Sequence, residues 1–451
     1  MHTNFTPEQL QDPTVARADT MLRRCVHCGF CTATCPTYLL LGDERDSPRG
    51  RIYLMKEMFE RGGKVTVPVT HHIDRCLSCL SCMTTCPSGV DYMHLVDLAR
   101  VRIEESGHRS LSERMTRWFL RKVLPSPSRF RFALLLGWLA RPFRGVLSKL
   151  GFHTGAAALE VTPARRPRLK LRKGKRVFRT ERPPIKRVAL MLGCVQEVLQ
   201  PSINRAAIRL LRRHGVEVIL PKDEACCGAL QHQLGHEEEA HKAARRNVDA
   251  WSSAIREGQL DAILITASGC GTMVKDYGHL LARDRGYGER ATEMSRLARD
   301  ITEFMHEIGL APPLAWTSLR VAYHSACSLQ HGQQVESEPR ALLAQAGFTV
   351  LEIPEGHICC GSAGTYNLLQ PELSGRLRER KLTNIASVKP DLIATGNIGC
   401  ITQLARGSSV PVVHTVELLD WATGGPCPKG LESVKSKVHP IQSLMELAST
   451  P

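Results

Sequence analysis

The sequence has little of what marks a membrane-spanning or exported protein. Its N-terminus, MHTNFTPEQLQDP, contains neither the basic segment nor the apolar core of a secretion signal. In the aromatic, arginine-rich region the longest apolar run is 132–140, whereas a spanning helix needs about 20 residues. We therefore expect a cytoplasmic chain, in which the 17 cysteines stay reduced and serve as metal ligands or redox groups rather than disulfides.

A nucleotide-binding fingerprint is also missing. No strand followed by GxGxxG, a helix and a later acidic residue occurs, and GSAGTY at 361–366 does not fit that pattern. Transfer of a hydride equivalent requires a flavin or nicotinamide cofactor. We therefore do not expect this chain to have a hydride-abstracting site of its own.

Acidic residues are scarce in one region only. Between positions 113 and 187 the chain has 21 Lys and Arg but three acidic residues, and this excess accounts for the net charge of +16. We interpret 111–185 as a basic helical arm and linker, because 165–187 combines dense charge with three prolines. It is either a solvated tether or a surface for anionic lipid headgroups or an acidic partner. No nucleic-acid-binding motif accompanies the charge, so nucleic acid is not an expected partner.

The N-terminal region, 1–110, contains the pattern CxxCxxCxxxCP twice. Three cysteines on such a loop can hold three corners of a four-iron cluster, and the fourth, followed by proline, ligates the other cluster in bacterial ferredoxins. The pattern predicts two 4Fe-4S clusters in a helical dicluster ferredoxin domain. The predicted ligands are Cys25, Cys28, Cys31 and Cys86 for cluster 1, and Cys76, Cys79, Cys82 and Cys35 for cluster 2.

The alternative from a different functional class is a zinc-stabilised binding protein. Zinc sites also use cysteine pairs, but they need only four ligands. The third cysteine of each run and the Cys-Pro ending would then have no role. Iron-sulfur chemistry is accordingly the favoured interpretation.

The C-terminal part contains an internal repeat. VALMLGC (188–194) matches VAYHSAC (321–327), and each is followed by a helix, a strand, the motif CCG and a later strand that runs into Gly-Cys. Strands alternating with amphipathic helices indicate parallel sheets. We predict an α+β multidomain protein in which α/β CCG modules at 186–310 and 311–425 follow the ferredoxin domain and precede a C-terminal tail, 426–451.

The cysteines of each module follow predicted parallel strands, and the carboxyl ends of such strands meet at one edge of a sheet. Helices that start after them stabilise anionic sulfur, and Gly228 and Gly361 allow the backbone to approach a bound group closely. A metal or cluster site is favoured, while zinc, a vicinal disulfide or a site without metal stay open. The candidate ligands are Cys194, Cys226, Cys227 and Cys270 in the first module, and Cys327, Cys359, Cys360 and Cys400 in the second.

Together, RCVHCGFCTATCPTYLLLGDERDSPRGRIYL, TASGCG and CCGSAGTY make positions 5–425 resemble the iron-sulfur subunits of bacterial glycolate oxidase. The resemblance implies an electron-transfer subunit whose flavin-containing (FAD) partner subunits oxidise glycolate to glyoxylate. Electrons would pass to a membrane quinone or another acceptor, which would place the complex at the cytoplasmic face of the inner membrane. An equivalent subunit of a lactate, other 2-hydroxyacid or glycerol-3-phosphate dehydrogenase is the nearest alternative.

One departure limits what the resemblance implies. Related heterodisulfide reductase B subunits end each module in CxxC and use five cysteines for a noncubane cluster. Met273 and Gln403 replace the second cysteine of that pair here. That cluster is therefore not carried over to this chain.

Overall fold

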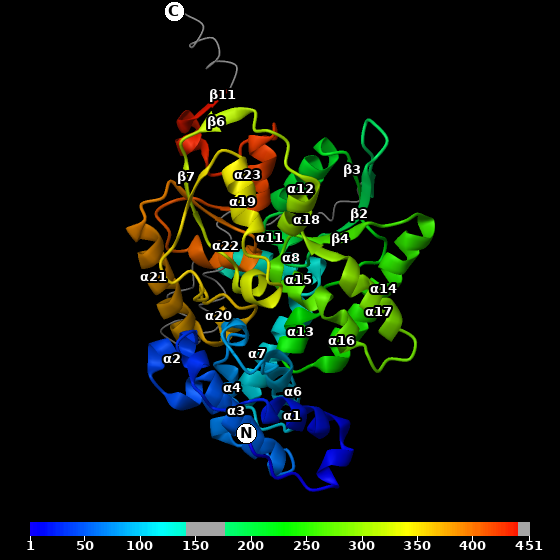
Figure 1. Cartoon of the computed structure of the whole chain (residues 1–451), viewed down its shortest axis with the longest axis vertical. Helices are drawn as coiled ribbons and strands as arrows, with labels where there is room; N and C mark the ends of the chain where they lie inside the picture. The colour runs from blue at the N-terminus through cyan, green and yellow to red at the C-terminus, as the bar shows by residue number, and fades with distance from the viewer. Residues whose placement is uncertain (141–175, 441–451) are drawn as a thin grey trace, which may run out of the picture.

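The computed structural model describes residues 1–140 and 176–440, with an all-helical N-terminal domain below an α/β body (Figure 1). Proline begins several helices of this domain, including Pro36 at the end of the first cysteine run, because its fixed φ suits the first helical turn. Buried aliphatic and aromatic side chains from four of the helices form the core. The helices are α1 (Pro13–Arg23), α2 (Pro36–Leu41), α3 (Pro48–Glu60), α4 (Val67–Asp74), α5 (Ser81–Thr84) and α6 (Tyr92–Glu105), with 3-10 turns η1 (Gln9–Gln11), η2 (Phe30–Thr32) and η3 (Glu44–Asp46).

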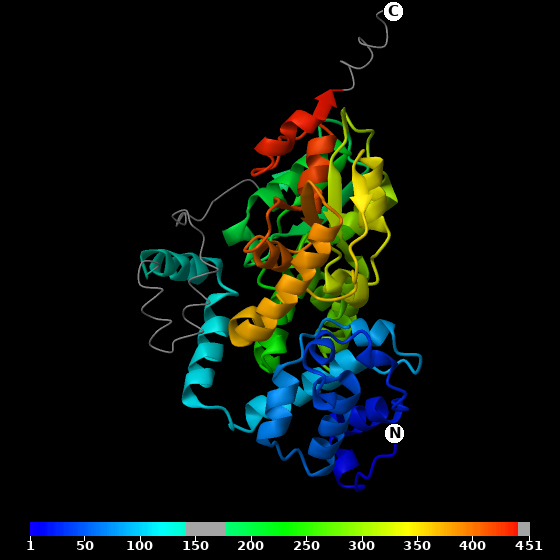
Figure 2. The ribbon, with the colours of Figure 1, turned by 90° about the vertical axis from the view of Figure 1, so that its left-hand side faces the viewer.

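Two further helices, α7 (Leu111–Val123) and α8 (Pro127–Ala140), form an arm on one side of the molecule (Figure 2). The arm contacts the first module through ion pairs of Arg121 with Glu239, at 2.8 Å, and of Arg131 with Glu197, at 3.1 Å. Within the predicted arm and linker, 111–185, positions 141–175 lie outside the described residues.

The end of the predicted linker is not a free tether. Strand β1 (Val177–Phe178) pairs antiparallel with β3 (Val216–Ile219) and so becomes an edge strand of the first module. Phe178 packs against the hydrophobic core, and this apolar contact holds the segment on the sheet.

The first module has a sheet in the order β1-β3-β2-β4-β5, in which all pairs except β1 with β3 are parallel. Short runs of fully buried β-branched and aliphatic residues form its central strands, as expected for a sheet covered on both faces. Besides β1 and β3, its elements are β2 (Lys186–Met191), α11 (Gln196–Leu199), α12 (Ser202–Arg213), α13 (Ala229–Gln233), α14 (Glu237–Glu257), β4 (Ala262–Ile265), α15 (Ser268–Lys275), α16 (Tyr277–Leu280), α17 (Gly288–Leu297), β5 (Ala298–Asp300) and α18 (Ile301–Ile308).

The second module has an all-parallel sheet in the order β10-β9-β7-β8. A separate antiparallel pair joins β6 to β11. The elements are β6 (Ala315–Thr317), β7 (Arg320–Tyr323), the π-helix η5 (Ser328–Gly332), α19 (Glu338–Gln345), β8 (Thr349–Leu351), α20 (Tyr366–Leu369), α21 (Pro371–Ser387), β9 (Leu392–Thr395), α22 (Ile398–Leu404), β10 (Val412–His414), α23 (Thr415–Ala422), the 3-10 helix η6 (Glu432–Lys437) and β11 (Val438–Pro440).

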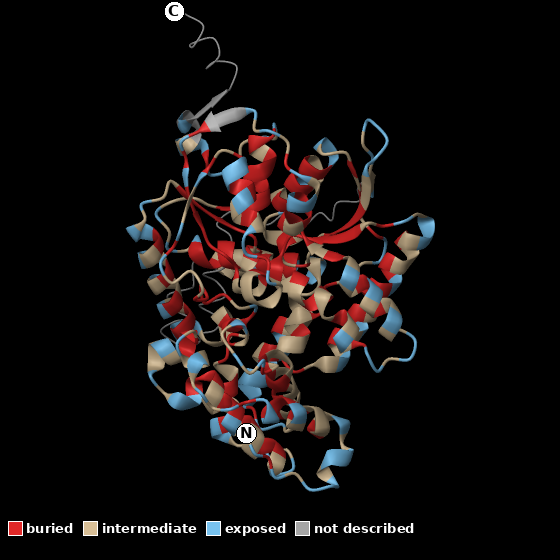
Figure 3. Ribbon diagram, viewed as in Figure 1, coloured by how far each residue is buried: buried red, intermediate tan, exposed pale blue. Residues whose placement is uncertain are grey.

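The two sheets have the same topology, because β3-β2-β4-β5 corresponds strand for strand to β8-β7-β9-β10. Both contribute to one continuous hydrophobic core, which includes Leu210 of α12 and Leu419 of α23. Buried residues accordingly concentrate on the strands and on the helices between the sheets (Figure 3). The predicted fold class, a helical domain followed by two repeated α/β modules, is confirmed.

Candidate metal centres

Cysteines of the first run lie around one pocket near the surface of the helical domain. Cys25, Cys28, Cys31 and Cys86, the predicted ligands of cluster 1, all line it, and Cys82 also reaches it. Cys28 is exposed, as are two apolar side chains of the same loop, Val26 at 66% and Phe30 at 62%. The ligand set stays a prediction, and the site would be accessible from outside the molecule.

The second set of cysteines is more deeply buried. Burial raises the pKa of Cys82, and the neighbouring Cys79, Cys76 and Cys35 raise it further, so the four side chains predicted to bind cluster 2 are neighbours. Four thiols converging in an apolar environment are a suitable donor set for an iron-sulfur cluster. This second ligand set also stays a prediction.

Two buried arginines surround the second set, and sequence analysis did not identify either. The Arg51 guanidinium lies 3.9 Å from the Cys35 sulfur and donates to the His72 carbonyl at 2.7 Å, while Arg100 donates to the Cys76 carbonyl at 2.9 Å. Burial would raise the pKa of Cys76, but Arg51 and Arg100 outweigh it and lower the pKa. Arg51 lies in α3, 16 residues from Cys35, and Arg100 lies in α6, 24 residues from Cys76, so neither belongs to the local spacing pattern of the cysteine runs.

The four cysteines of the first module lie in sequence order around the ends of β2, β3 and β4. The sulfur atoms of Cys194 and Cys226 are 3.3 Å apart. The pKa of Cys227 is raised by interaction with the Cys226 and Cys270 side chains and by burial, so the contacts continue to the fourth cysteine. All four predicted candidates of this module are therefore brought together.

The glycine of each CCG motif is required by helix packing. Gly228 and Gly361 have φ of 89° and 88°, and a Cβ at Gly361 would lie 2.6 Å from the Ser374 carbonyl oxygen of α21. At Gly228 the equivalent contact is with Ala240 of α14, at 3.1 Å. The close approach is thus between the backbone of each CCG motif and a helix of the same module, so the cysteine pair lies directly beside that helix.

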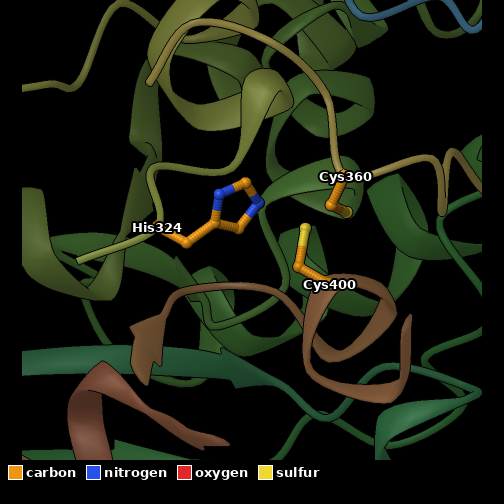
Figure 4. Close-up of side chains that lie close together, drawn as sticks. All are labelled: His324, Cys360 and Cys400. Atoms are coloured by element: carbon orange, nitrogen blue, oxygen red, sulfur yellow. The ribbon is translucent and has the colours of Figure 1, made fainter. Parts of the chain in front are cut away.

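In the second module the cysteines form the same chain of contacts. Cys359 interacts with the side chains of Cys327 and Cys360, and Cys360 interacts with Cys400. His324, at the end of β7, joins them, because a ring nitrogen and the sulfurs of Cys360 and Cys400 all lie within 4.8 Å of one another (Figure 4). Burial and the nearby Lys381 lower the pKa of His324 to about 3, so the imidazole is neutral. Sequence analysis missed this histidine, although its position three residues before Cys327 was a usable signal.

Positions 273 and 403 carry no thiol. Met273 is buried in the core of the first module. The Gln403 amide donates to the Ser374 hydroxyl at 2.7 Å, and that hydroxyl donates to the Gly361 carbonyl at 2.8 Å. Gln403 is therefore linked through Ser374 to the backbone of the CCG motif.

The helical domain docks its second cysteine run onto the second module. Cys79 packs with Cys327 and Cys359 in a small apolar cluster that also contains Leu77 and Tyr366. Burial raises the pKa of Cys79, with Cys327 as the next contributor. The two cysteine groups, more than 200 residues apart in the chain, are thus adjacent in space.

Comparison with known proteins shows which family the chain belongs to. The chain is 43% identical over 424 residues to the glycolate oxidase iron-sulfur subunit of Escherichia coli (strain K12), which covers 94% of this chain and 99% of the relative. This chain belongs to the family of glycolate oxidase iron-sulfur subunits. Another member of the family, a probable glycolate oxidase iron-sulfur subunit of Bacillus subtilis (strain 168), is 32% identical over 94% of this chain and 99% of its own length. The resemblance stated from the motifs is confirmed.

Two domain families match parts of the chain, and a more distant relative bears on the lactate alternative. Residues 21–90 match the 4Fe-4S dicluster domain, and 188–275 and 321–405 match the cysteine-rich CCG domain. These matches support iron-sulfur clusters over the zinc-stabilised alternative. Lactate utilization protein A of Oceanobacillus iheyensis is 26% identical over 52% of this chain and 96% of its own length, so the lactate alternative is supported less well than the glycolate oxidase family.

A solved structure supports the fold alone. A hypothetical protein from Helicobacter pylori superimposes with a TM-score of 0.50 at 9% identity, covering 97% of this chain and 76% of that one.

Within residues 1–140 and 176–440, no helix has both the length and the apolar character needed to cross a membrane.

Proposed function

We propose that this chain is the electron-transfer subunit of a glycolate oxidase complex. A flavin in a partner subunit would take two electrons from glycolate, giving glyoxylate and releasing two protons. Two 4Fe-4S clusters, when bound, supply one-electron storage. This chain would then deliver the electrons singly, and a quinone would take up two electrons and two protons.

The contact between Cys79 and the second module carries this proposal. Cys79 belongs to the second ferredoxin run, and it packs against Cys327 and Cys359 in the apolar cluster described above. Apolar packing excludes water and fixes the distance between the two cysteine groups. The chain thereby offers a continuous series of sulfur-rich sites from the helical domain into the second module.

The surface around the first run supports a direction for the route. Cys28, Val26 and Phe30 are exposed there, whereas Cys76, Cys82 and Cys35 are buried. An exposed apolar loop beside a redox site is suited to docking a partner protein. Electrons would enter at the first run and leave through the second run towards the second module.

Serine substitutions test the route. Cys25→Ser and Cys76→Ser each remove one predicted ligand, and we expect glycolate-dependent reduction of quinone by the assembled complex to be lost in both. Glycolate-dependent reduction of the flavin, measured by its absorbance, should persist because the chemistry on glycolate occurs in the partner. Full quinone reduction in either variant would contradict the proposal.

The side chains exposed on the arm support contact with an anionic lipid surface, and the quinone would be reached there. On α7, Leu111 and Met115 are 77% and 72% exposed, and Trp118 and Phe119 follow on the same helix among arginines. Exposed apolar side chains next to basic ones suit the interface of an anionic membrane.

Cosedimentation with vesicles tests the arm. Wild-type protein should bind vesicles containing phosphatidylglycerol more strongly than purely phosphatidylcholine vesicles, and Trp118→Ser should weaken that binding. Tyr53→Ser removes an equally exposed aromatic residue from α3 and should have no effect. Equal binding to both kinds of vesicle would argue against a role of the arm in lipid contact.

A further inference from the structure

His324 is a buried imidazole that lacks the partners such a group normally has. Its residue is 1% exposed, and neither ring nitrogen has a hydrogen-bond partner within the described part of the chain. An unsatisfied buried polar group costs on the order of 1–3 kcal/mol. A fold retains such a group at little cost when a bound ligand satisfies it.

The surroundings of the imidazole indicate what that ligand is. A ring nitrogen of His324 and the sulfurs of Cys360 and Cys400 lie within 4.8 Å of one another, and the ring extends towards the two cysteines (Figure 4). Ligands of one tetrahedral ion, with bonds of about 2.0–2.3 Å, lie roughly 3.3–3.8 Å apart. Small side-chain adjustments therefore bring all three donors onto a single metal atom. Imidazole and thiolate together suit zinc and iron.

Three separate elements position these donors. His324 follows β7, and its backbone N–H donates to the Ala394 carbonyl of β9 at 2.8 Å. Cys360 lies in the CCG loop, and Cys400 is in the first turn of α22, whose Asn397 side chain accepts from the Gly399 N–H. The pairing of β7 with β9 links the backbone at His324 to the strand before α22, and the tight packing of Gly361 on α21 fixes the loop of Cys360, so the fold holds the donor set in place.

The first module differs at this position. Met191 ends β2 three residues before Cys194, as His324 stands three residues before Cys327, and Met191 is also buried. A thioether is a weaker acceptor than an imidazole nitrogen. The repeat therefore places a nitrogen donor in the second module and sulfur only in the first.

We propose that His324 coordinates, through a ring nitrogen, a thiophilic metal centre that Cys360 and Cys400 also bind, so that the two modules have chemically different sites. A single zinc ion and an iron-sulfur cluster share this donor chemistry. The inference goes beyond the electron-transfer role, because it holds whether or not electrons pass through the second module.

The first test examines the wild-type full chain, purified without oxygen, and needs no variant. Iron and zinc are quantified, X-ray absorption is recorded at the zinc edge, and pulsed electron paramagnetic resonance is recorded on the reduced protein with and without 15N-histidine. A zinc–nitrogen shell identifies an ion, whereas a 15N-sensitive coupling to a reduced iron centre identifies iron. Either result supports the proposal, and the absence of both overturns it.

Matched variants then assign the nitrogen. His324→Met introduces the residue of the first module, and we expect loss of the nitrogen signal and of the metal of one site. Met191→Leu makes a similar change in the first module and should leave both unchanged. Retention of the nitrogen signal in folded His324→Met, or its loss in Met191→Leu, would exclude His324 as the ligand. Flavin-coupled quinone reduction is measured separately, so a failure of the electron-transfer proposal can be distinguished from a failure of the His324 proposal.

Discussion

The buried charge of Arg51 provides a sharp test of the second cluster site. Arg51 contacts Cys35, pairs with Asp46 at 3.2 Å and is fully buried. Burial alone would lower the pKa of Arg51, but the nearby Tyr92, Cys76 and Cys35 raise it, so the side chain stays charged. A fixed positive charge favours the reduced cluster, which has one more negative charge, and Arg51→Met should therefore lower its reduction potential.

The size of the shift follows from the distance. A unit charge at 3.9 Å, the separation of the Arg51 nitrogen from the Cys35 sulfur, contributes about 4 kcal/mol at an effective dielectric constant of about 20. For a one-electron couple this corresponds to about 170 mV. That value is an upper limit, because the added electron spreads over the cluster and Asp46 offsets part of the charge. We expect a decrease on the order of 50–100 mV.

Potentiometric titration followed by electron paramagnetic resonance measures both potentials in the full chain. Arg51→Lys retains the charge and should shift the potential much less than Arg51→Met. Arg49→Met is a matched control, since Arg49 lines the pocket of the first run and should affect only the other cluster. Asp46 keeps Arg75, at 2.8 Å, and His72, at 3.0 Å, as partners in the variant, which favours folding. Equal shifts in Arg51→Lys and Arg51→Met would refute the electrostatic argument.

Two further predictions concern stability. Gly361→Ala should lower the free energy of unfolding by at least about 2 kcal/mol, because Gly361 has a positive φ and a Cβ there would lie 2.6 Å from the Ser374 carbonyl oxygen. Gly269→Ala, which has open space around its Cβ, should be neutral or slightly stabilising. Denaturant titration compares the two variants, and equal effects would contradict the packing role of Gly361. His94 bridges Asp91, at 2.7 Å, and Asp276 of the first module, at 3.1 Å; burial lowers its pKa, but the two carboxylates outweigh this and raise it to about 10. The stabilisation is thus complete below the unfolded pKa of about 6.5 and lost as the pH rises through about 10. His94→Gln should cost about 1–3 kcal/mol at pH 7 and flatten that dependence, as measured by urea unfolding at several pH values; an unchanged slope would exclude His94 as its source.

The amino-acid sequence alone determined the fold class and the cysteine groups. The ferredoxin runs and the CCG motifs are local patterns, in which spacing along the chain restricts which atoms can share a centre. The match of VALMLGC with VAYHSAC, each followed by a CCG motif, likewise predicted the repeat, which the matching strand orders bear out. In contrast, the sequence did not predict β1, because this strand forms only by pairing with β3, which lies farther along the chain.

Only the tertiary structure decided which distant groups meet. Arg51 reaches Cys35, and His324 reaches Cys400, through helix and sheet packing that no local periodicity encodes. The contact of Cys79 with Cys327 also depends on how the helical domain docks against the second module. Sequence spacing restricts which ligands can share a centre when they lie on one loop. Long-range packing decides which charges and neighbours surround those ligands, because the neighbours come from other elements. The separation of such elements along the chain does not determine their distance in space.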